Sequence, residues 1–251
     1  MNRRTVTLVL MTLVAMSAPG CTHLPGQPGP GPEVKRPEDI VDFEALYAQN
    51  CSACHGAEGK GGAAVALADP TYLRFIDDAT LRNVTANGIP GTSMPGFAQS
   101  AGGMLTDHQV DVLVQQMRAR WARPEALGGT APPPYRADVS GDAQRGVGVY
   151  KVFCVSCHGP DGKGAAKAGS IVEGAYLALV TDQDLRTAVI VGRPDSGAPD
   201  WRNNIPGRPM TDQEVSDVVA WLAAQRPQNP DQSNPASRET ATQRKESGGL
   251  P

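Results

Sequence analysis

A five-residue segment with two cysteines and a histidine occurs twice in this chain of 251 residues. The first copy is Cys51-Ser52-Ala53-Cys54-His55 and the second is Cys154-Val155-Ser156-Cys157-His158. Two thiols three positions apart, followed directly by an imidazole, form the attachment signature of a covalently bound c-type haem. One helical turn brings both sulfurs within reach of the two vinyl groups of a porphyrin, and the next ring nitrogen faces the iron. The sequence therefore predicts two haem c groups, attached through Cys51, Cys54, Cys154 and Cys157, with His55 and His158 as iron ligands.

Other uses of paired cysteines explain less of this pattern. Zinc ribbons usually separate their two cysteine pairs by roughly 15–20 residues, far fewer than lie between these pairs. A thioredoxin-like CxxC would not need a histidine after both copies. Simple disulfides are compatible with an exported protein, but they explain neither the histidines nor the repeat. The haem interpretation accounts for all three features.

The similarity between the two halves extends beyond the haem motif. Matched pairs keep the same order along the chain: Tyr47 and Tyr150, Gly59-Lys60-Gly61 and Gly162-Lys163-Gly164, Tyr72 and Tyr176, Arg82 and Arg186, Thr106 and Thr211. Similarity at this scale predicts two copies of one domain of roughly 85–90 residues, which we place at residues 38–123 and 139–227. Residues 124–138 are rich in proline and predict a semi-rigid linker. Residues 228–251 are polar and unpatterned, which predicts a disordered tail.

Each half reads as helices joined by loops rich in glycine and proline. We expect a first helix at 39–50 and its counterpart at 142–154, and a second pair at 77–88 and 181–192. The last helix is best defined at its start, because Thr211 and Glu214 form a capping box that Thr106 and Gln109 nearly copy. Apolar residues then recur at helical spacing after both caps. No strand pattern competes, so the sequence predicts an all-α fold with two tandem domains.

The N-terminus has the order of an export signal. Arg3 and Arg4 precede an apolar run from Val6 to Met16, and small residues follow up to Cys21. The segment ending at Cys21 resembles a bacterial lipobox, in which the cysteine is lipidated and becomes the new N-terminus. We therefore expect a signal peptide at residues 1–20, a lipid anchor on Cys21 and a spacer at 21–37, with the protein on the periplasmic or cell-surface side of a membrane. The alternative is cleavage nearby, which would leave Cys21 free or paired with another molecule.

The charge balance favours protein partners over nucleic acid. The chain has 23 basic and 26 acidic residues. Removal of residues 1–20 takes away two arginines and no acids, which leaves 21 bases against 26 acids, a net charge of −5. A mildly acidic surface is compatible with a partner that bears a basic docking patch. We expect no nucleic-acid binding.

Both halves resemble class I (mitochondrial-type) cytochrome c domains, over residues 38–227. The resemblance implies an N-terminal helix that crosses a C-terminal helix, with the haem in a crevice between loops. It also implies a methionine as the sixth iron ligand, on a loop before the last helix and often followed by proline. Met94-Pro95 matches this pattern, so Met94 is the expected ligand in the first half. Met104 is its rival, while Met117 falls in the last helix and His108 in that helix's exposed first turn.

The second half departs from the family pattern at this ligand. Aligning Gly88 with Gly192 and Pro95 with Pro199 sets Ala198 opposite Met94, and alanine cannot bind iron. The remaining methionine is Met210, which we keep as the candidate metal ligand. Its position just before the Thr211 cap also suits a staple residue packed on the first helical turn. The open alternatives are a vacant or water-bound iron and a nitrogen donor from Lys151, Lys163 or Lys167.

Two repeated pairs have two possible functions each. The pairs Tyr72/Tyr176 and Arg82/Arg186 would suit contacts to haem propionates, because a buried carboxylate needs a donor or a cation. Alternatively, the tyrosines pack in the core and the arginines lie on a solvated helix face. The Gly-Lys-Gly segments lack the spacing of a phosphate-binding loop, and we interpret them as turns close to the haem edge.

These features together favour an electron carrier over an enzyme. Together with the expected anchor at Cys21, the resemblance implies a membrane-anchored dihaem cytochrome c that transfers single electrons between respiratory-chain partners. A quinol-oxidising or terminal-oxidase complex is an assembly that would use such a subunit. The alternative is a redox enzyme or ligand sensor that uses an open sixth position at haem 2. The second half shows no distal histidine or acid–base pair, which disfavours catalysis there.

Overall fold

The computed structural model describes residue 31 and residues 34–227 of the chain. The chain divides into two compact units, residues 1–39 and residues 40–251. In the first unit the described part contains a short 3-10 helix, η1 (Pro37–Asp39). The predicted signal peptide, Cys21 and the predicted tail lie outside the described residues. None of the helices in the described ranges is long and apolar enough to cross a membrane.

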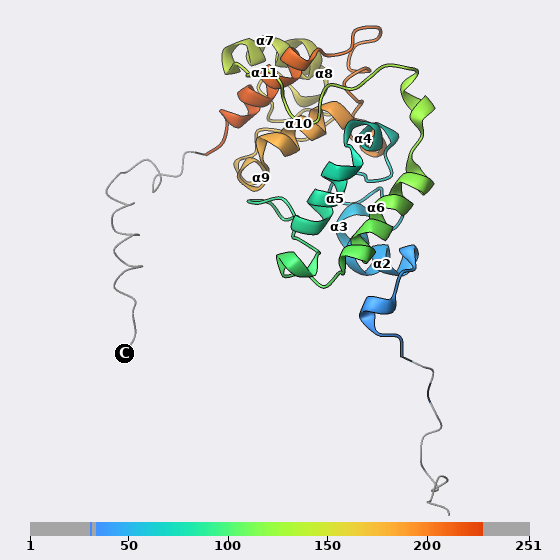
Figure 1. Ribbon diagram of the computed structural model, residues 1–251. Coiled ribbons are helices and arrows are strands. Elements are labelled where there is room, and N and C mark those ends of the chain that lie inside the picture. Colours follow the sequence, from blue (N-terminus) through green and yellow to red (C-terminus); the bar gives the residue numbers. More distant parts are fainter. Residues whose placement is uncertain (1–30, 32–33, 228–251) are drawn as a thin grey trace, which may run out of the picture. The chain divides into compact units, whose positions relative to one another are not determined.

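The second unit contains both copies of the repeat, and its regular elements are helices throughout the described part, as the sequence predicts (Figure 1). The first copy contains α2 (Phe43–Asn50), α3 (Ser52–His55), α4 (Pro70–Phe75), α5 (Asp78–Asn87), η2 (Gln99–Ala101) and α6 (Asp107–Trp121). A short 3-10 helix, η3 (Pro124–Leu127), follows. The second copy contains α7 (Ala143–Phe153), α8 (Val155–His158), α9 (Gly174–Leu179), α10 (Asp182–Val191), η4 (Pro194–Ser196) and α11 (Asp212–Ala223).

Side-chain caps set the starts of most of these helices. The predicted capping boxes at Thr106 and Thr211 are both present, and Thr181 forms a third at the start of α10. Asp77 caps α5 by accepting a hydrogen bond from the backbone of Thr80. The second helices of both copies end at glycines with positive φ, 71° at Gly88 and 69° at Gly192. The predicted second and last helices are thus confirmed.

Helix α7 matches its predicted range, with Asp142 as its N-cap and Cys154 as its C-cap, but the first helix of the first copy and two short helices differ from expectation. Helix α2 begins at Phe43, after the cap Asp42, rather than near residue 39. Helices α4 and α9 were not predicted, although the Tyr-Leu repeats lie inside them. The proline-rich segment after α6 also has more structure than a plain linker. Its Leu127 is buried, and the ring of Tyr135 lies 5.1 Å from that of Phe75.

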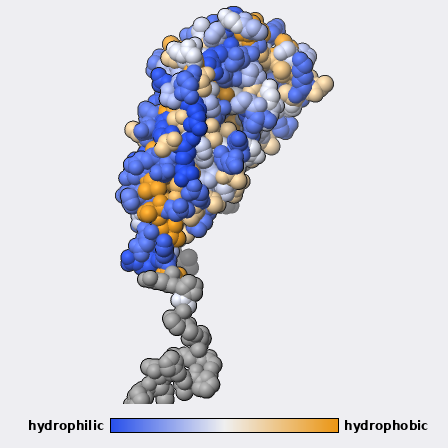
Figure 2. All heavy atoms as spheres, turned by 90° about the vertical axis from the view of Figure 1, so that its right-hand side faces the viewer, coloured by the Kyte–Doolittle hydropathy of each residue, from blue (hydrophilic) through white to orange (hydrophobic). Residues whose placement is uncertain are grey.

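The core of each copy forms where its first and last helices meet. In the first copy Tyr47 of α2 meets Trp121 of α6, with ring centroids 5.2 Å apart. In the second copy Tyr150 of α7 meets Trp221 of α11 at 4.3 Å. These rings join a buried set of aliphatic residues from the last helices: Val110, Leu113, Val215 and Val218. On the face drawn in Figure 2 polar residues predominate, and hydrophobic residues gather in smaller areas between them.

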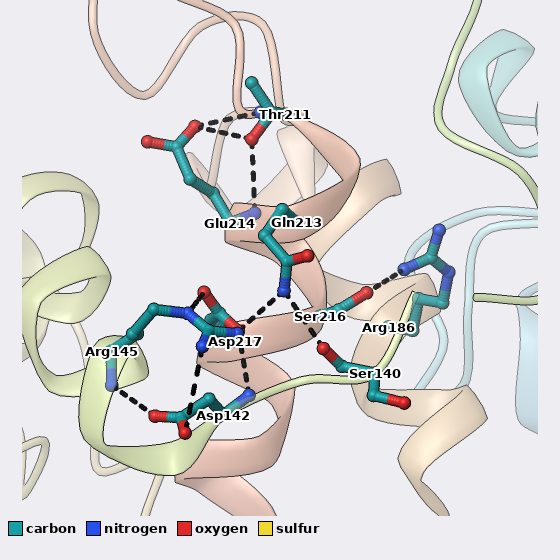
Figure 3. Close-up of polar contacts among 9 residues, drawn as sticks. All are labelled: Ser140, Asp142, Arg145, Arg186, Thr211, Gln213, Glu214, Ser216 and Asp217. Atoms are coloured by element: carbon teal, nitrogen blue, oxygen red, sulfur yellow. Dashed lines mark hydrogen bonds and ion pairs between the residues drawn. The ribbon is translucent and has the colours of Figure 1, made fainter. Parts of the chain in front are cut away.

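A polar network reinforces the contact between α7 and α11 (Figure 3). Asp217 on α11 is almost completely buried, and its carboxylate accepts two hydrogen bonds from the guanidinium of Arg145, at 2.8 and 2.7 Å. The backbone N–H of Asp142 and the amide of Gln213 donate to the same carboxylate at 2.8 and 2.9 Å. The Arg145 guanidinium holds the pKa of Asp217 below its usual value. The network fixes the start of α7, the helix that leads into the second haem motif.

Polar contacts also join the two copies within this unit. The guanidinium of Arg193 donates to the carbonyl oxygens of Gly62 and Ala63 at 2.7 and 3.0 Å. The backbone N–H of Gly61 donates in return to the carboxylate of Asp195 at 3.2 Å. The segment of the first copy that is held in this way follows directly after its haem motif.

Candidate haem sites

Each haem motif forms one tight helical turn at the end of a longer helix. Cys51 ends α2 and begins α3, and its carbonyl accepts the backbone N–H of His55 at 3.0 Å. Cys154 does the same between α7 and α8, where its carbonyl accepts the N–H of His158 at 3.0 Å. The structure therefore brings both predicted cysteines and the predicted histidine onto one turn in each copy. This is the arrangement that the attachment of a porphyrin through two thioethers requires.

Both histidine rings are oriented by a backbone carbonyl. Nδ1 of His55 lies 2.8 Å from the carbonyl oxygen of Val65, and Nδ1 of His158 lies 2.9 Å from that of Gly169. A carbonyl only accepts, so Nδ1 carries the proton and Nε2 keeps its lone pair for a metal. Burial lowers the pKa of His55, which favours the same neutral form. Both histidines thus fit the function of an axial iron ligand.

The cysteines are free thiols and do not pair with one another. Burial raises the pKa of Cys51 to about 12 and that of Cys154 to about 11. Within the described ranges no three histidine, cysteine, aspartate or glutamate side chains gather into a possible metal site. The two cysteine pairs are thus not assembled into one four-ligand zinc site.

The repeated tyrosines tie each haem turn to its preceding helix. The hydroxyl of Tyr47 donates to the carbonyl of Gly56 at 2.9 Å, and the hydroxyl of Tyr150 donates to the carbonyl of Gly159. Each glycine directly follows the histidine of its haem motif. Sequence comparison of the halves found these tyrosines but not their function. Their constant position, four residues before the first cysteine, was the available signal.

The Gly-Lys-Gly segments are turns, as predicted, and they contact a tryptophan. Gly59 has a φ of 74°, and a Cβ there would lie 2.9 Å from the ring of Trp121. Gly162 has a φ of 77° and lies beside Trp221 in the same way. Glycine is required at both positions because a side chain would strain the backbone and displace the tryptophan.

The loop before the last helix has the same backbone frame in both copies. The N–H of Ile89 donates to the carbonyl of Met94 at 3.0 Å, and the N–H of Arg193 donates to that of Ala198 at 2.9 Å. A Cβ on Gly88 would meet the Met94 carbonyl at 2.6 Å, and a Cβ on Gly192 would meet the Ala198 carbonyl at 2.8 Å. The structure therefore places Ala198 where the first copy has Met94, as the sequence alignment predicts.

Met210 occupies the position that Leu105 has in the first copy. Its backbone N–H donates to the carbonyl of Trp201 at 2.9 Å, and that of Leu105 donates to the carbonyl of Phe97 at 2.8 Å. Both side chains are buried directly before the cap of the last helix. The sulfur of Met210 lies 4.0 Å from the amide nitrogen of Asn204.

The other candidate ligands are either exposed or part of the core. Met104 is 78% exposed, and Met117 is buried within α6. His108 is exposed in the first turn of α6, as expected. The three lysines considered for the second iron are all exposed: Lys151, Lys163 and Lys167.

The repeated arginines are engaged by the last helix of their own copy. Arg82 forms ion pairs with Asp107 and Asp111, at 3.0 and 2.6 Å. Arg186 is buried, pairs with Asp212 and donates to the hydroxyl of Ser216 at 3.2 Å. These contacts give the arginines a structural function that needs no propionate. The matched tyrosines differ, because Tyr72 is buried and Tyr176 is 42% exposed.

Comparison with known families agrees with this geometry. A family model described as cytochrome c oxidase, cbb3-type, subunit III matches residues 38–115, and one described as cytochrome c matches residues 143–226. Each match contains one complete haem motif with its histidine.

Several known proteins are similar to parts of the chain. The cbb3-type cytochrome c oxidase subunit CcoP of an Azospirillum species is 30% identical over 153 residues, 55% of this chain and 47% of that protein. The dihydro-heme d1 dehydrogenase of Pseudomonas aeruginosa is 45% identical over 71 residues, 28% of this chain and 13% of that protein. The cytochrome bc1 complex cytochrome c subunit of Mycobacterium tuberculosis is 24% identical over 184 residues, 70% of this chain and 60% of that protein. The chain spans less than two thirds of the length of each.

The haem turns, the carbonyl-anchored histidines and the two family matches lead to one conclusion. The chain contains two tandem, all-α cytochrome c domains, each with one covalently bound haem c.

Proposed function

We propose that this protein carries single electrons between redox partners of a respiratory membrane complex. The observation that carries the proposal is the pair of histidines whose Nδ1 atoms are bound to backbone carbonyls, at 2.8 and 2.9 Å. A ring held in this way keeps its orientation when the iron changes oxidation state, which suits electron transfer. The haem itself supplies the redox chemistry, and the protein positions it and tunes its potential.

The proposed ligands of haem 1 are His55 and Met94, with thioether links to Cys51 and Cys54. Met94 lies in a loop that is tied back to the end of α5 through the Ile89 backbone, which holds the methionine in place. A methionine opposite a histidine raises the reduction potential of a haem. Haem 2 is attached through Cys154 and Cys157, and its proposed proximal ligand is His158.

The respiratory context rests on the relatives. Two of them are named as subunits of a cbb3-type oxidase and of a bc1 complex. We infer that the partners of this protein are likewise redox proteins in or at a membrane. We also propose that a lipid on Cys21 anchors the protein at the periplasmic or cell-surface side, which would raise its effective concentration near such complexes.

The test uses the full haem-loaded protein and membranes of the organism that makes it. Stopped-flow spectroscopy would follow reduction of the protein by these membranes with a quinol donor, and its reoxidation by the same membranes in the presence of oxygen. We expect both reactions, and membranes treated with inhibitors of the quinol-oxidising complex and of the terminal oxidase serve as controls. A protein that holds two haems, but is neither reduced by membranes supplied with quinol nor reoxidised by them in the presence of oxygen, would contradict the proposal.

The anchor is tested separately. Cys21→Ser should release the protein from membranes into the soluble fraction, while its haem content stays unchanged. Retention of this variant on membranes that have been washed with high salt would contradict lipidation at Cys21.

A further inference from the structure

We propose that haem 2 has an open sixth position that binds a small uncharged ligand, and that Met210 is a packing residue. The inference rests on the proposed ligation of haem 2 by His158. It goes beyond electron transfer because it assigns a binding site to one of the two haems. Differences between matched positions of the two copies support it.

The first step is the loss of the methionine from an intact loop. The hydrogen bonds that frame the loop have nearly the same length in both copies, 3.0 Å at Met94 and 2.9 Å at Ala198. Gly88 and Gly192 approach the two loops in the same way. The loop of the second copy therefore keeps this part of the frame. It differs elsewhere, because the N–H of Ala198 donates to the carbonyl of Arg193 and that of Met94 donates to the hydroxyl of Thr92. At the matched position the methionine side chain is replaced by a methyl group. A methyl group cannot coordinate iron.

The second step is the position of Met210. Met210 and Leu105 make the same backbone hydrogen bond, at 2.9 and 2.8 Å, to the matched residues Trp201 and Phe97. Leucine has no donor atom, yet it fills this position in the first copy. The position therefore serves to pack a side chain against the last helix, which is the usual function of an apolar residue before a capping box.

The third step concerns the remaining donors. Residues 139–227 contain one histidine, His158, and one methionine, Met210. The lysines of this copy are exposed at Lys151, Lys163 and Lys167. Within the described part of the second copy, no further histidine or methionine side chain is available for the iron.

The surroundings of the loop favour an uncharged ligand. Ala198 and Pro199 are apolar, and Trp201 is buried. Two arginines of this segment are both engaged: the guanidinium of Arg193 donates to carbonyl oxygens of the first copy, and that of Arg202 pairs with Asp200 at 2.6 Å. An anion at this site would lose its hydration without gaining a free cation, which is costly. A neutral diatomic molecule loses little hydration and binds ferrous haem.

The test measures carbon monoxide binding to the reduced, haem-loaded, full-length protein by optical titration. We expect the wild type to bind about one carbon monoxide per two haems, because haem 1 is closed by Met94. Met94→Ala should double the bound amount. Ala198→Met, as a single change in the wild-type protein, should abolish carbon monoxide binding, because the new sulfur would stand at the position that Met94 has in the first copy. Met210→Leu should leave both the spectrum and the bound amount unchanged.

Two results would overturn the inference. One is a wild type that binds no carbon monoxide, whether or not Met210→Leu opens a site. The other is a Met210→Leu spectrum that shows loss of a sulfur ligand from haem 2. Neither bears on electron exchange with membranes, so a protein that passes electrons but binds no carbon monoxide would keep its proposed function and lose only this inference.

Discussion

At the scale of single residues, two tyrosine side chains each hold several elements of their copy together. Tyr47 and Tyr150 each donate to the carbonyl of the glycine that follows an iron-ligand histidine. Each ring also packs on the tryptophan of the last helix. A single side chain thus connects the first helix, the haem turn and the last helix of its copy.

Tyr47→Phe should keep the packing and lose the hydrogen bond. The Gly56 carbonyl would then lack its donor, and we expect the free energy of unfolding to fall by about 1–2 kcal/mol. Urea unfolding of the haem-loaded protein would measure the change. Tyr176→Phe is the matched control, because that ring is 42% exposed, and its stability should stay close to wild type. Equal losses in both variants would contradict the assigned function of Tyr47.

Much of the site can be predicted from sequence at this scale, but its supporting contacts cannot. The cysteines, the histidines and Met94 can be proposed from the sequence because their chemistry depends on side-chain type and spacing, and the ligation by Met94 stays a prediction. Val65 and Gly169 are not evident, because they orient the histidines through carbonyl oxygens that every residue possesses.

At the scale of helices, the elements with side-chain caps were predictable and the shortest ones were not. Thr106, Thr181 and Thr211 all cap helices through capping boxes. Helices α4 and α9 span only six residues each, too few to show a helical period. Asp69 followed by Pro70 was a usable signal for the start of α4, because aspartate caps and proline suits the first helical position.

The buried carboxylate between α7 and α11 makes the second domain sensitive to acid (Figure 3). The pKa of Asp217 is lower in the folded protein than in the unfolded chain. Protonation therefore favours unfolding, and the stabilisation is fully present above about pH 4 and is lost as the pH falls below that value.

Asp217→Asn should lower the free energy of unfolding by about 1–3 kcal/mol at pH 7, because the charge-assisted hydrogen bonds from Arg145 are lost. The difference from wild type should shrink as the pH falls below about 4. Urea unfolding at pH 7, 5 and 3 would measure it. Asp161→Ala, which removes an exposed ion pair with Lys163, is the control and should change little. A difference that is independent of pH would contradict the assigned charge effect.

At the scale of the whole molecule, the two domains share a helical scaffold and differ at the position of Met94 in the first copy and Ala198 in the second. Duplication was evident from the sequence, because the matched pairs keep their order. The packing of the segment between the domains was not, because proline-rich composition predicts only an extended backbone. Its contacts depend on partners far away in sequence: the Pro134 carbonyl accepts hydrogen bonds from Arg186, and the Tyr135 carbonyl accepts one from Gln183.

The two haems should titrate at different potentials. We expect a redox titration of the wild type to show two steps, with haem 1 at the higher potential because of Met94. Met94→Ala should lower the upper step by about 0.1 V or more, within the ~0.8 V range that axial ligands span. Spectroelectrochemistry would measure both steps, and Met104→Ala, at an exposed methionine, is the control. A single step in the wild type, unchanged in Met94→Ala, would contradict this ligand assignment.

We expect the hydrogen bonds from Arg193 to couple the two haem sites. Arg193 begins the loop that contains Ala198. Its guanidinium donates to the carbonyls of Gly62 and Ala63, and Ala63 lies two residues before Val65, whose carbonyl orients His55. A shift of that loop when a ligand binds haem 2 would move residues 62–65, the segment that orients the His55 ring. Carbon monoxide bound at haem 2 should therefore shift the midpoint reduction potential of haem 1. Arg193→Ala should remove this shift, because the potential of haem 1 would depend on ligand binding at haem 2 only while Arg193 connects the two segments.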